Sequence, residues 1–207
     1  MDANLTDEQQ MMVASAREFL RDACPLATVR DWEKLPDRYP REIWARMAEM
    51  GWTGAIYPEA FGGLGLTNLD MALLMREMGR VALPSPILST VLLAGRAILA
   101  GGSEAQKQGL LPKIAAGEVL LSFALTEASA RPDAATVRTS ARAVGDGYVL
   151  NGTKHFVEFA EQAGQMLVVA RTSESANPGQ GLTMFLVDAR APGIEYIPLQ
   201  TLALQPQ

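Results

Sequence analysis

Side chains that commonly do chemistry are scarce in this chain. Its 207 residues include one histidine, His155, and one cysteine, Cys24. One of each cannot make a structural zinc site, and a His-rich catalytic zinc site is excluded as well. A Ser-His-Asp triad would have to use His155, and no G-x-S-x-G turn precedes a predicted helix. The sequence therefore points away from zinc enzymes and serine hydrolases.

The remaining candidates are carboxylates and one strand-end hydroxyl. Glu127 and Glu158 are separated by a predicted hairpin, and no local pair of carboxylates stands out as acid and base. Leu125-Thr126-Glu127 ends a strand-like apolar run, where a backbone edge and the Thr126 hydroxyl could hydrogen-bond the polar rim of a ligand. A threonine at a strand end is more often structural, so this signal is weak alone.

A glycine-rich segment, Gly63-Leu64-Gly65-Leu66-Thr67-Asn68, nearly fits the dinucleotide-binding pattern G-x-G-x-x-G. It lacks the third glycine, and no strand–helix–strand unit surrounds it. The segment is better interpreted as a loop that enters a helix.

Composition narrows the class of protein. The net charge is −5 and the basic residues are scattered, which argues against nucleic acid as a partner. No apolar run approaches the roughly 20 residues of a membrane helix, and the first residues, MDANL, do not resemble a signal peptide. A single cysteine suits a reducing compartment. We therefore expect a cytoplasmic protein without a membrane span.

The first half of the chain is predicted to be helical. Capping boxes at Thr6–Gln9 and Ser103–Gln106 each open a helix, and apolar residues recur at helical spacing between them. The first predicted helix ends at Cys24-Pro25. Further helices are predicted over residues 41–50, 68–81 and 87–100, the last of them apolar on most faces.

The period of the pattern changes after Gly117. Residues 136–144 and 147–150 carry β-branched and aromatic side chains around Gly145-Asp146-Gly147, which predicts a hairpin. Apolar runs of strand length follow at residues 165–171 and 182–187. We predict an α+β multidomain protein, in which an all-α N-terminal domain (residues 1–119) precedes a small antiparallel β-barrel domain (residues 120–207).

Four segments together resemble the acyl-CoA dehydrogenase family. Residues 57–66 (YPEAFGGLGL) are similar to its Y-P-E-x-x-G-G-x-G loop, and residues 106–118 to its Q-K-x-x-x-L-P-x-x-x-x-G-E. Phe123-Ala124-Leu125-Thr126-Glu127 is similar to A-L-T-E, and Leu150-Asn151-Gly152-Thr153-Lys154 to L-N-G-x-K. Each motif is weak alone, but their order and spacing are specific and cover essentially the whole chain.

The resemblance implies a helical domain, a β-barrel middle domain and a C-terminal four-helix domain. The first two agree with the pattern above, and the third is missing. The chain ends on TLALQPQ, which suggests a middle domain truncated at its C-terminal end. In the family the C-terminal domain usually supplies the catalytic glutamate, so we expect the catalytic base to lie outside these residues.

The activity implied by the resemblance is FAD-dependent α,β-dehydrogenation of an acyl-CoA thioester. A carboxylate removes the α-proton while the β-hydride passes to the flavin. Electrons then leave to an electron-transfer flavoprotein, and members of the family form homo- or hetero-oligomers. Two alternatives stay open: a non-catalytic partner subunit of a heteromeric dehydrogenase, and an oxidase-type relative.

The resemblance also assigns site residues by position. Phe123, Leu125 and Thr126 should border the flavin, with Thr126 as the best hydrogen-bonding candidate. Phe156 and Glu158 match a second flavin-lining segment.

Two positions depart from the family pattern. Arg131 and Pro132 stand where the family has Gly and a Ser that contacts the CoA thioester arm, and proline offers neither hydroxyl nor N–H. Glu158 stands where the family has a hydroxyl residue near flavin N5. As a carboxylate facing the flavin, it would disfavour the charge of the reduced form.

Overall fold

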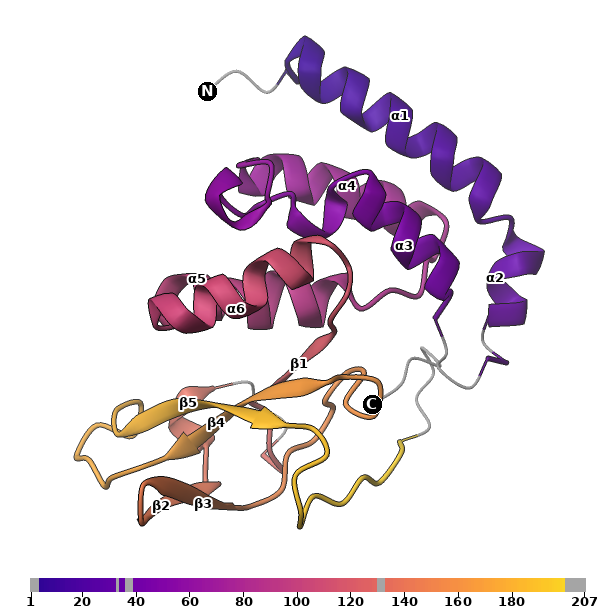
Figure 1. Cartoon of the computed structure of the whole chain (residues 1–207). Helices are drawn as coiled ribbons and strands as arrows, with labels where there is room; N and C mark the ends of the chain where they lie inside the picture. Colours follow the sequence, from indigo (N-terminus) through magenta and orange to yellow (C-terminus); the bar gives the residue numbers. More distant parts are fainter. Residues whose placement is uncertain (1–3, 33, 36–38, 130–132, 200–207) are drawn as a thin grey trace. The chain divides into compact units, whose positions relative to one another are not determined.

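The computed structural model describes residues 4–32, 34–35, 39–129 and 133–199. The chain forms two compact units (Figure 1). The first comprises residues 1–85 and 98–118, and the second comprises residues 86–97 and 119–207. The domain division predicted between residues 119 and 120 therefore stays a prediction, because a segment from the first half of the chain clusters with the second unit.

The first unit is helical, as predicted. Thr6 and Ser103 each accept a hydrogen bond from the backbone N–H three residues on, and the glutamine side chain there accepts one from the backbone N–H of the cap residue. Thr67 and Asp70 form a third capping box. One short helix was not predicted from the sequence. The helices are α1 (Asp7–Ala23), the unpredicted α2 (Leu26–Trp32), α3 (Arg41–Glu49), α4 (Asn68–Arg80) and α6 (Glu104–Ala115).

Helices α1 and α4 are joined by a buried carboxylate. Glu77 of α4 is buried and receives two hydrogen bonds from the Arg17 guanidinium of α1, at 2.9 and 3.0 Å. Arg76 and Arg80 complete the ion pairs around it. The hydrogen bonds from Arg17, which outweigh the effect of burial, lower the pKa of Glu77. This cluster is a structural connection between helices.

The glycine-rich loop is a tightly folded structural element. Gly65 N donates to Tyr57 O at 2.9 Å, and Leu66 N donates to Ala55 O at 2.8 Å. Tyr57 itself is fully buried. A Cβ added at Gly63 would fall onto the Tyr57 carbonyl and lie 2.6 Å from Gly54 O. The loop therefore requires glycine at position 63 for close approach of backbone to backbone.

The apolar helix predicted over residues 87–100 divides into two parts. Residues Ile87–Gly95 are wound as a π-helix, and α5 (Arg96–Gly101) follows. Most of the π-helix is buried, as predicted, and it packs on the first strand of the sheet. The buried Thr90 hydroxyl donates to Leu121 O at 2.9 Å and accepts from Leu121 N at 3.1 Å.

The second unit is built on a five-stranded sheet (Figure 1). Strand β4 pairs along seven residues with β5, and it also pairs with β1 and, at one position, with β2. The order is β1-β4-β2-β3, with β5 on β4. The strands are β1 (Leu121–Ala124), β2 (Ser140–Val144), β3 (Gly147–Asn151), β4 (Gln165–Arg171) and β5 (Leu182–Asp188).

The predicted helical and sheet-containing parts are confirmed, but the sheet is mixed where an antiparallel one was predicted. Strand β1 runs parallel to β4, from Leu121 opposite Gln165 to Ala124 opposite Val168. Parallel strands need a long crossover, and residues 125–164 supply it. The predicted hairpin is present: β2 and β3 pair antiparallel around the turn at Gly145, whose φ is +57°.

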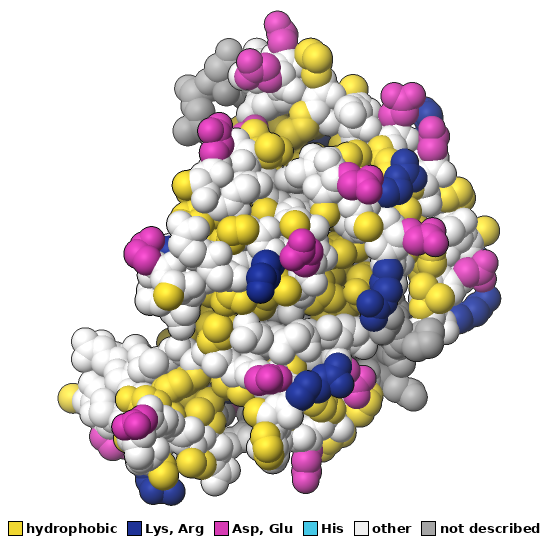
Figure 2. All heavy atoms as spheres, in the orientation of Figure 1, with side chains coloured by type: hydrophobic (Ala, Val, Ile, Leu, Met, Phe, Trp, Pro, Cys, Tyr) yellow, Lys and Arg dark blue, Asp and Glu magenta, His cyan; other side chains and the backbone are white. Residues whose placement is uncertain are grey.

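The surface offers no continuous basic face in the view of Figure 2. Lys and Arg side chains lie apart from one another there, mixed with Asp and Glu. Among the described residues, no helix has both the length and the apolar character to cross a membrane. In the same residues, no cluster of three His, Cys, Asp or Glu side chains could hold a metal ion.

Candidate functional site

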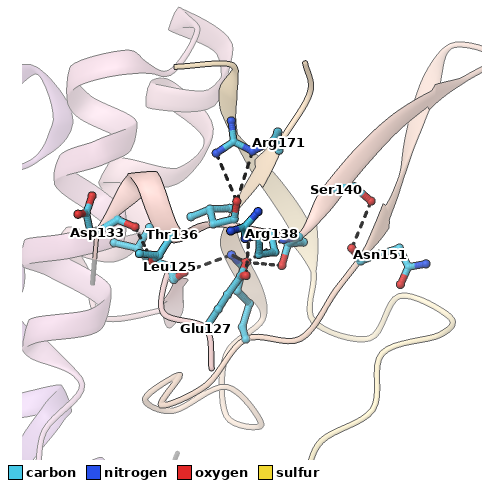
Figure 3. Close-up of polar contacts among 11 residues, drawn as sticks. Leu125, Glu127, Asp133, Thr136, Arg138, Ser140, Asn151 and Arg171 are labelled. Atoms are coloured by element: carbon cyan, nitrogen blue, oxygen red, sulfur yellow. Dashed lines mark hydrogen bonds and ion pairs between the residues drawn. The ribbon is translucent and has the colours of Figure 1, made fainter. Parts of the chain in front are cut away.

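The site begins where β1 ends. The apolar strand leads into Leu125-Thr126-Glu127, and the Glu127 side chain is buried, with 9% of its surface exposed. Its carboxylate accepts from Arg138 N at 2.7 Å, from Thr139 N at 2.9 Å and from Thr139 Oγ1 at 2.7 Å. Lys154 Nζ donates to it at 2.7 Å. Figure 3 shows the Glu127 side chain pointing towards Arg138. Glu127 therefore binds three chain segments together.

Hydrogen bonds in this cluster stabilise the ionised form of the Glu127 carboxyl group. Burial alone would raise the pKa of Glu127, but the bonds from Lys154, Thr139 and the Arg138 N–H outweigh it and lower the pKa to about 2. The carboxylate is consequently ionised at neutral pH and paired with the ammonium of Lys154, whose side chain is also only 9% exposed. This pair suits a structural role and not proton transfer at neutral pH.

Acid should weaken the protein through this carboxylate. In the unfolded chain Glu127 takes up a proton near its ordinary pKa of 4.5, whereas in the folded chain it does so only near 2. The stabilisation is complete above pH 5 and is lost as the pH falls from about 4.5 towards 2. The difference corresponds to about 3 kcal/mol.

Urea unfolding between pH 7 and pH 3 measures this effect. Other depressed carboxyl groups, such as Glu77, also contribute to the pH dependence. The Glu127→Gln variant is therefore the control, and its stability should vary less with pH than that of the wild type. Parallel pH profiles for the two proteins would contradict the assignment.

The two predicted flavin-lining segments lie side by side. Lys154 Nζ donates to Leu125 O at 3.2 Å, and His155 N donates to Thr126 O at 2.9 Å. Thr126 thus accepts a hydrogen bond from His155, the residue before Phe156, although Thr126 and Phe156 are 30 positions apart in the sequence. The half-buried Leu125 and Thr126 form one side of this arrangement.

The second segment has an unusual backbone. Phe156 has φ of +56°, and 53% of its side chain is exposed. At the other end of the segment, the fully buried Ser122 donates from Oγ to Glu158 O at 2.8 Å. Burial raises the pKa of the Glu158 carboxyl group, which favours its neutral form.

The predicted site residues fall into three groups. The structure hydrogen-bonds Leu125 and Thr126 to Lys154 and His155, the two residues that precede Phe156. Phe123 lies in β1 opposite Leu167 and is half-buried, and Glu158 is tied to the same strand. Arg131 and Pro132 lie outside the described residues. The contacts of all seven with a ligand stay predictions.

Sequence reasoning missed the residues that hold the site together. Lys154 belonged only to the L-N-G-x-K motif, and Glu127 was considered with Glu158 as an acid or base, although two opposite charges flanking predicted flavin segments are a usable signal. Thr139 and Ser122 carried no signal, because a hydroxyl in a strand is ordinary. Their partners become visible only when the chain is folded.

Two family models match the chain. The acyl-CoA dehydrogenase N-terminal domain matches residues 6–118, and the acyl-CoA dehydrogenase middle domain matches residues 122–205. This pair of domains defines a class of acyl-thioester oxidoreductases, and the mixed sheet with its preceding helices agrees with it. The chain belongs to the acyl-CoA dehydrogenase family, which confirms the resemblance seen in its motifs.

Individual relatives agree with this membership. Acryloyl-CoA reductase (NADH) of Anaerotignum propionicum is 37% identical over 197 residues, which are 93% of this chain and 49% of the relative. A glutaryl-coenzyme A dehydrogenase in complex with glutaryl-CoA has a TM-score of 0.88 and 31% identity, covering 100% of this chain and 53% of that chain. The ChsE4-ChsE5 complex from Mycobacterium tuberculosis has a TM-score of 0.86 and 28% identity, with coverages of 100% and 54%. The chain spans about half the length of the relatives it matches.

Proposed function

We propose that this protein binds FAD and takes part in the α,β-dehydrogenation of an acyl-CoA thioester. One observation carries the proposal. The 2.9 Å hydrogen bond from His155 N to Thr126 O joins the two segments that the family resemblance assigns to the flavin. Two motifs that are weak when read separately therefore form one local surface.

The residues present fit a flavin. The Thr126 hydroxyl is a donor for the polar rim of the ring system, with Leu125 beside it. Phe156 exposes an aromatic side chain that would cover the ring, and Phe123 and Glu158 would complete the border. Bound flavin would supply a hydride acceptor, and the protein residues would bind it, orient it and exclude water.

The remaining parts of the function concern the whole protein. We place the catalytic base outside these 207 residues and assign an acyl-CoA as substrate, with Arg131 and Pro132 on the substrate side. An electron-transfer flavoprotein is the proposed electron acceptor, and a homo- or hetero-oligomer is the proposed assembly. Family membership supports all four.

Flavin binding is the direct test of the proposal. The purified whole protein is incubated with FAD, desalted and examined by visible absorbance. Retention of close to one flavin per chain, with a spectrum shifted from that of free FAD, is the expected result. A colourless protein after reconstitution would overturn the cofactor assignment.

Replacing Thr126 with valine should weaken FAD binding. The substitution keeps the shape and removes one hydrogen bond, so we expect about 1 kcal/mol, or roughly a fivefold higher Kd. Fluorescence titration measures the Kd, and Thr183→Val, at an exposed position of β5, is the matched control. An unchanged Kd in Thr126→Val would refute the role of this hydroxyl.

A relative's name favours one variant of this function. The 37% identical protein is an acryloyl-CoA reductase, which favours a reaction that runs towards the saturated thioester. Steady-state assays of the whole protein separate the directions. Reduction of an enoyl-CoA that far exceeds oxidation of the acyl-CoA would assign a reductase.

A second candidate is a non-catalytic partner subunit. The similarity to the two-protein ChsE4-ChsE5 complex supports this alternative. Such a subunit would bind flavin poorly by itself, and it would raise flavin retention and activity when mixed with a catalytic partner. Absorbance after reconstitution, with and without the partner, distinguishes the two candidates.

A further inference from the structure

The loop around Phe156 has a strained backbone conformation. Phe156 adopts φ of +56°, in the left-handed region that is costly for residues other than glycine. Phe156 is 53% exposed, so burial of its ring contributes little free energy to offset this strain. Glycine would satisfy this backbone better. A strained and exposed phenylalanine persists only when its surroundings fix the backbone.

Both ends of this loop are fixed to the same strand and its extension. His155 N donates to Thr126 O at 2.9 Å before Phe156. Ser122 Oγ donates to Glu158 O at 2.8 Å after it. Ser122 carries a fully buried hydroxyl in an otherwise apolar strand, and the Glu158 carbonyl accepts its hydrogen bond. The loop is therefore anchored at its two ends with Phe156 between them.

The first of these anchors is itself supported by the buried ion pair. Lys154 precedes His155, and its ammonium bridges Leu125 O and the Glu127 carboxylate. Gly152 lies so close to Thr139 that an added Cβ would come within 2.7 Å of Thr139 Cα. Lys154 and His155 are thus held against residues 125–127, and Gly152 is held against Thr139.

We propose that Ser122 and Lys154 are positioning residues that hold Phe156 as a preformed wall for the flavin. This inference rests on the proposed function, because it assumes that the ligand is a flavin. If Phe156 and its loop are already ordered before binding, the entropy cost of ordering them is not subtracted from the binding free energy. Loss of either support leaves Phe156 free to relax and lowers affinity for the planar ring system.

The main experiment compares Ser122→Ala with Ser140→Ala. Ser140 also donates to a backbone carbonyl, Asn151 O at 3.4 Å, but it is exposed and lies outside the loop. We expect Ser122→Ala to raise the Kd for FAD roughly tenfold, and to speed amide hydrogen exchange of residues 155–158 roughly tenfold without ligand. Ser140→Ala should change neither, and amides of β4 should keep their protection in both variants.

Visible circular dichroism of the bound flavin gives a readout that stability alone would not move. A changed ring signal is expected at saturating FAD in Ser122→Ala, and a wild-type signal in Ser140→Ala. If Ser122→Ala leaves exchange, Kd and ring signal within twofold of the wild type, the inference is wrong. If the wild type itself binds no FAD, the proposed function fails first, and the exchange measurement still decides whether Ser122 holds the loop.

A second pair of variants tests the role of Phe156 without removing the buried Ser122 hydroxyl. Phe156→Gly and Phe156→Ala both remove the wall, but only glycine relieves the strain. Both should raise the Kd for FAD roughly tenfold, and the unfolding equilibrium constant of Phe156→Gly should be severalfold smaller than that of Phe156→Ala. Equal stability of the two variants, or wild-type affinity in either, would contradict the inference.

Lys154 is tested by conservative rescue. Lys154→Met should free the His155 amide for exchange and weaken FAD binding, because the ammonium that bridges Leu125 and Glu127 is gone. Lys154→Arg keeps the charge. It should therefore recover part of the protection of the His155 amide and part of the affinity for FAD. Full loss in both variants with normal loop exchange would exclude Lys154 as a positioning residue.

Discussion

Alanine in place of Gly63 is expected to destabilise the helical unit by about 3 kcal/mol or more. The added methyl group has no flexible neighbour to displace. It meets the backbone of Tyr57 and of Gly54, both of which also hold the loop together through hydrogen bonds. Relief would require the whole segment to shift, which would disturb the fully buried Tyr57.

Urea unfolding followed by far-ultraviolet circular dichroism measures the loss. Gly79→Ala is the matched control, because this glycine lies in α4 and an added Cβ would meet nothing within 4 Å. The control should be neutral or more stable, by up to about 1 kcal/mol. If Gly63→Ala lowers the free energy of unfolding by no more than a few tenths of a kcal/mol, the loop can adjust to the added methyl group and the prediction is wrong.

Glu127→Gln is expected to cost about 3–5 kcal/mol. The change leaves the buried Lys154 ammonium without its counter-charge, and it turns an acceptor of four hydrogen bonds into a group that also carries an NH2 donor. At least one of the backbone donors at Arg138 and Thr139 then loses its acceptor.

An exposed ion pair provides the comparison for this variant. Glu104 pairs with Lys107 at 2.9 Å, but the glutamate is 77% exposed, so Glu104→Gln should leave the unfolding midpoint nearly unchanged. The double variant Glu127→Gln/Lys154→Met should lose less than the sum of the single variants. Additive losses would show that the pair is not coupled.

Features set by neighbouring residues could be predicted from the sequence. The capping boxes at Thr6 and Ser103 fixed two helix starts, and the glycine turn at residues 145–147 placed a hairpin. One local prediction was incomplete. Cys24-Pro25 was interpreted as a stop, but a proline also suits the start of a helix, and α2 begins at Leu26.

Features that depend on distant residues could not be predicted. The parallel pairing of β1 with β4 joins segments about 40 positions apart, and both strands are short apolar runs without a register signal. In the site, Thr126 and Phe156 were named from the resemblance. The supports of the site were missed, because Ser122 reaches Glu158 and Lys154 reaches Glu127 only through the folded chain.

The placement of residues 86–97 has a consequence for how such proteins can be divided or recombined. The chain enters the second unit at Pro86, returns to the first at Ile98 and enters the second again at Val119. A cut at residue 119 would therefore separate Thr90 from the backbone of Leu121, which it binds through two hydrogen bonds. The sheet and the π-helix belong to one compact unit. Exchange of parts between relatives must carry the π-helix together with the strands.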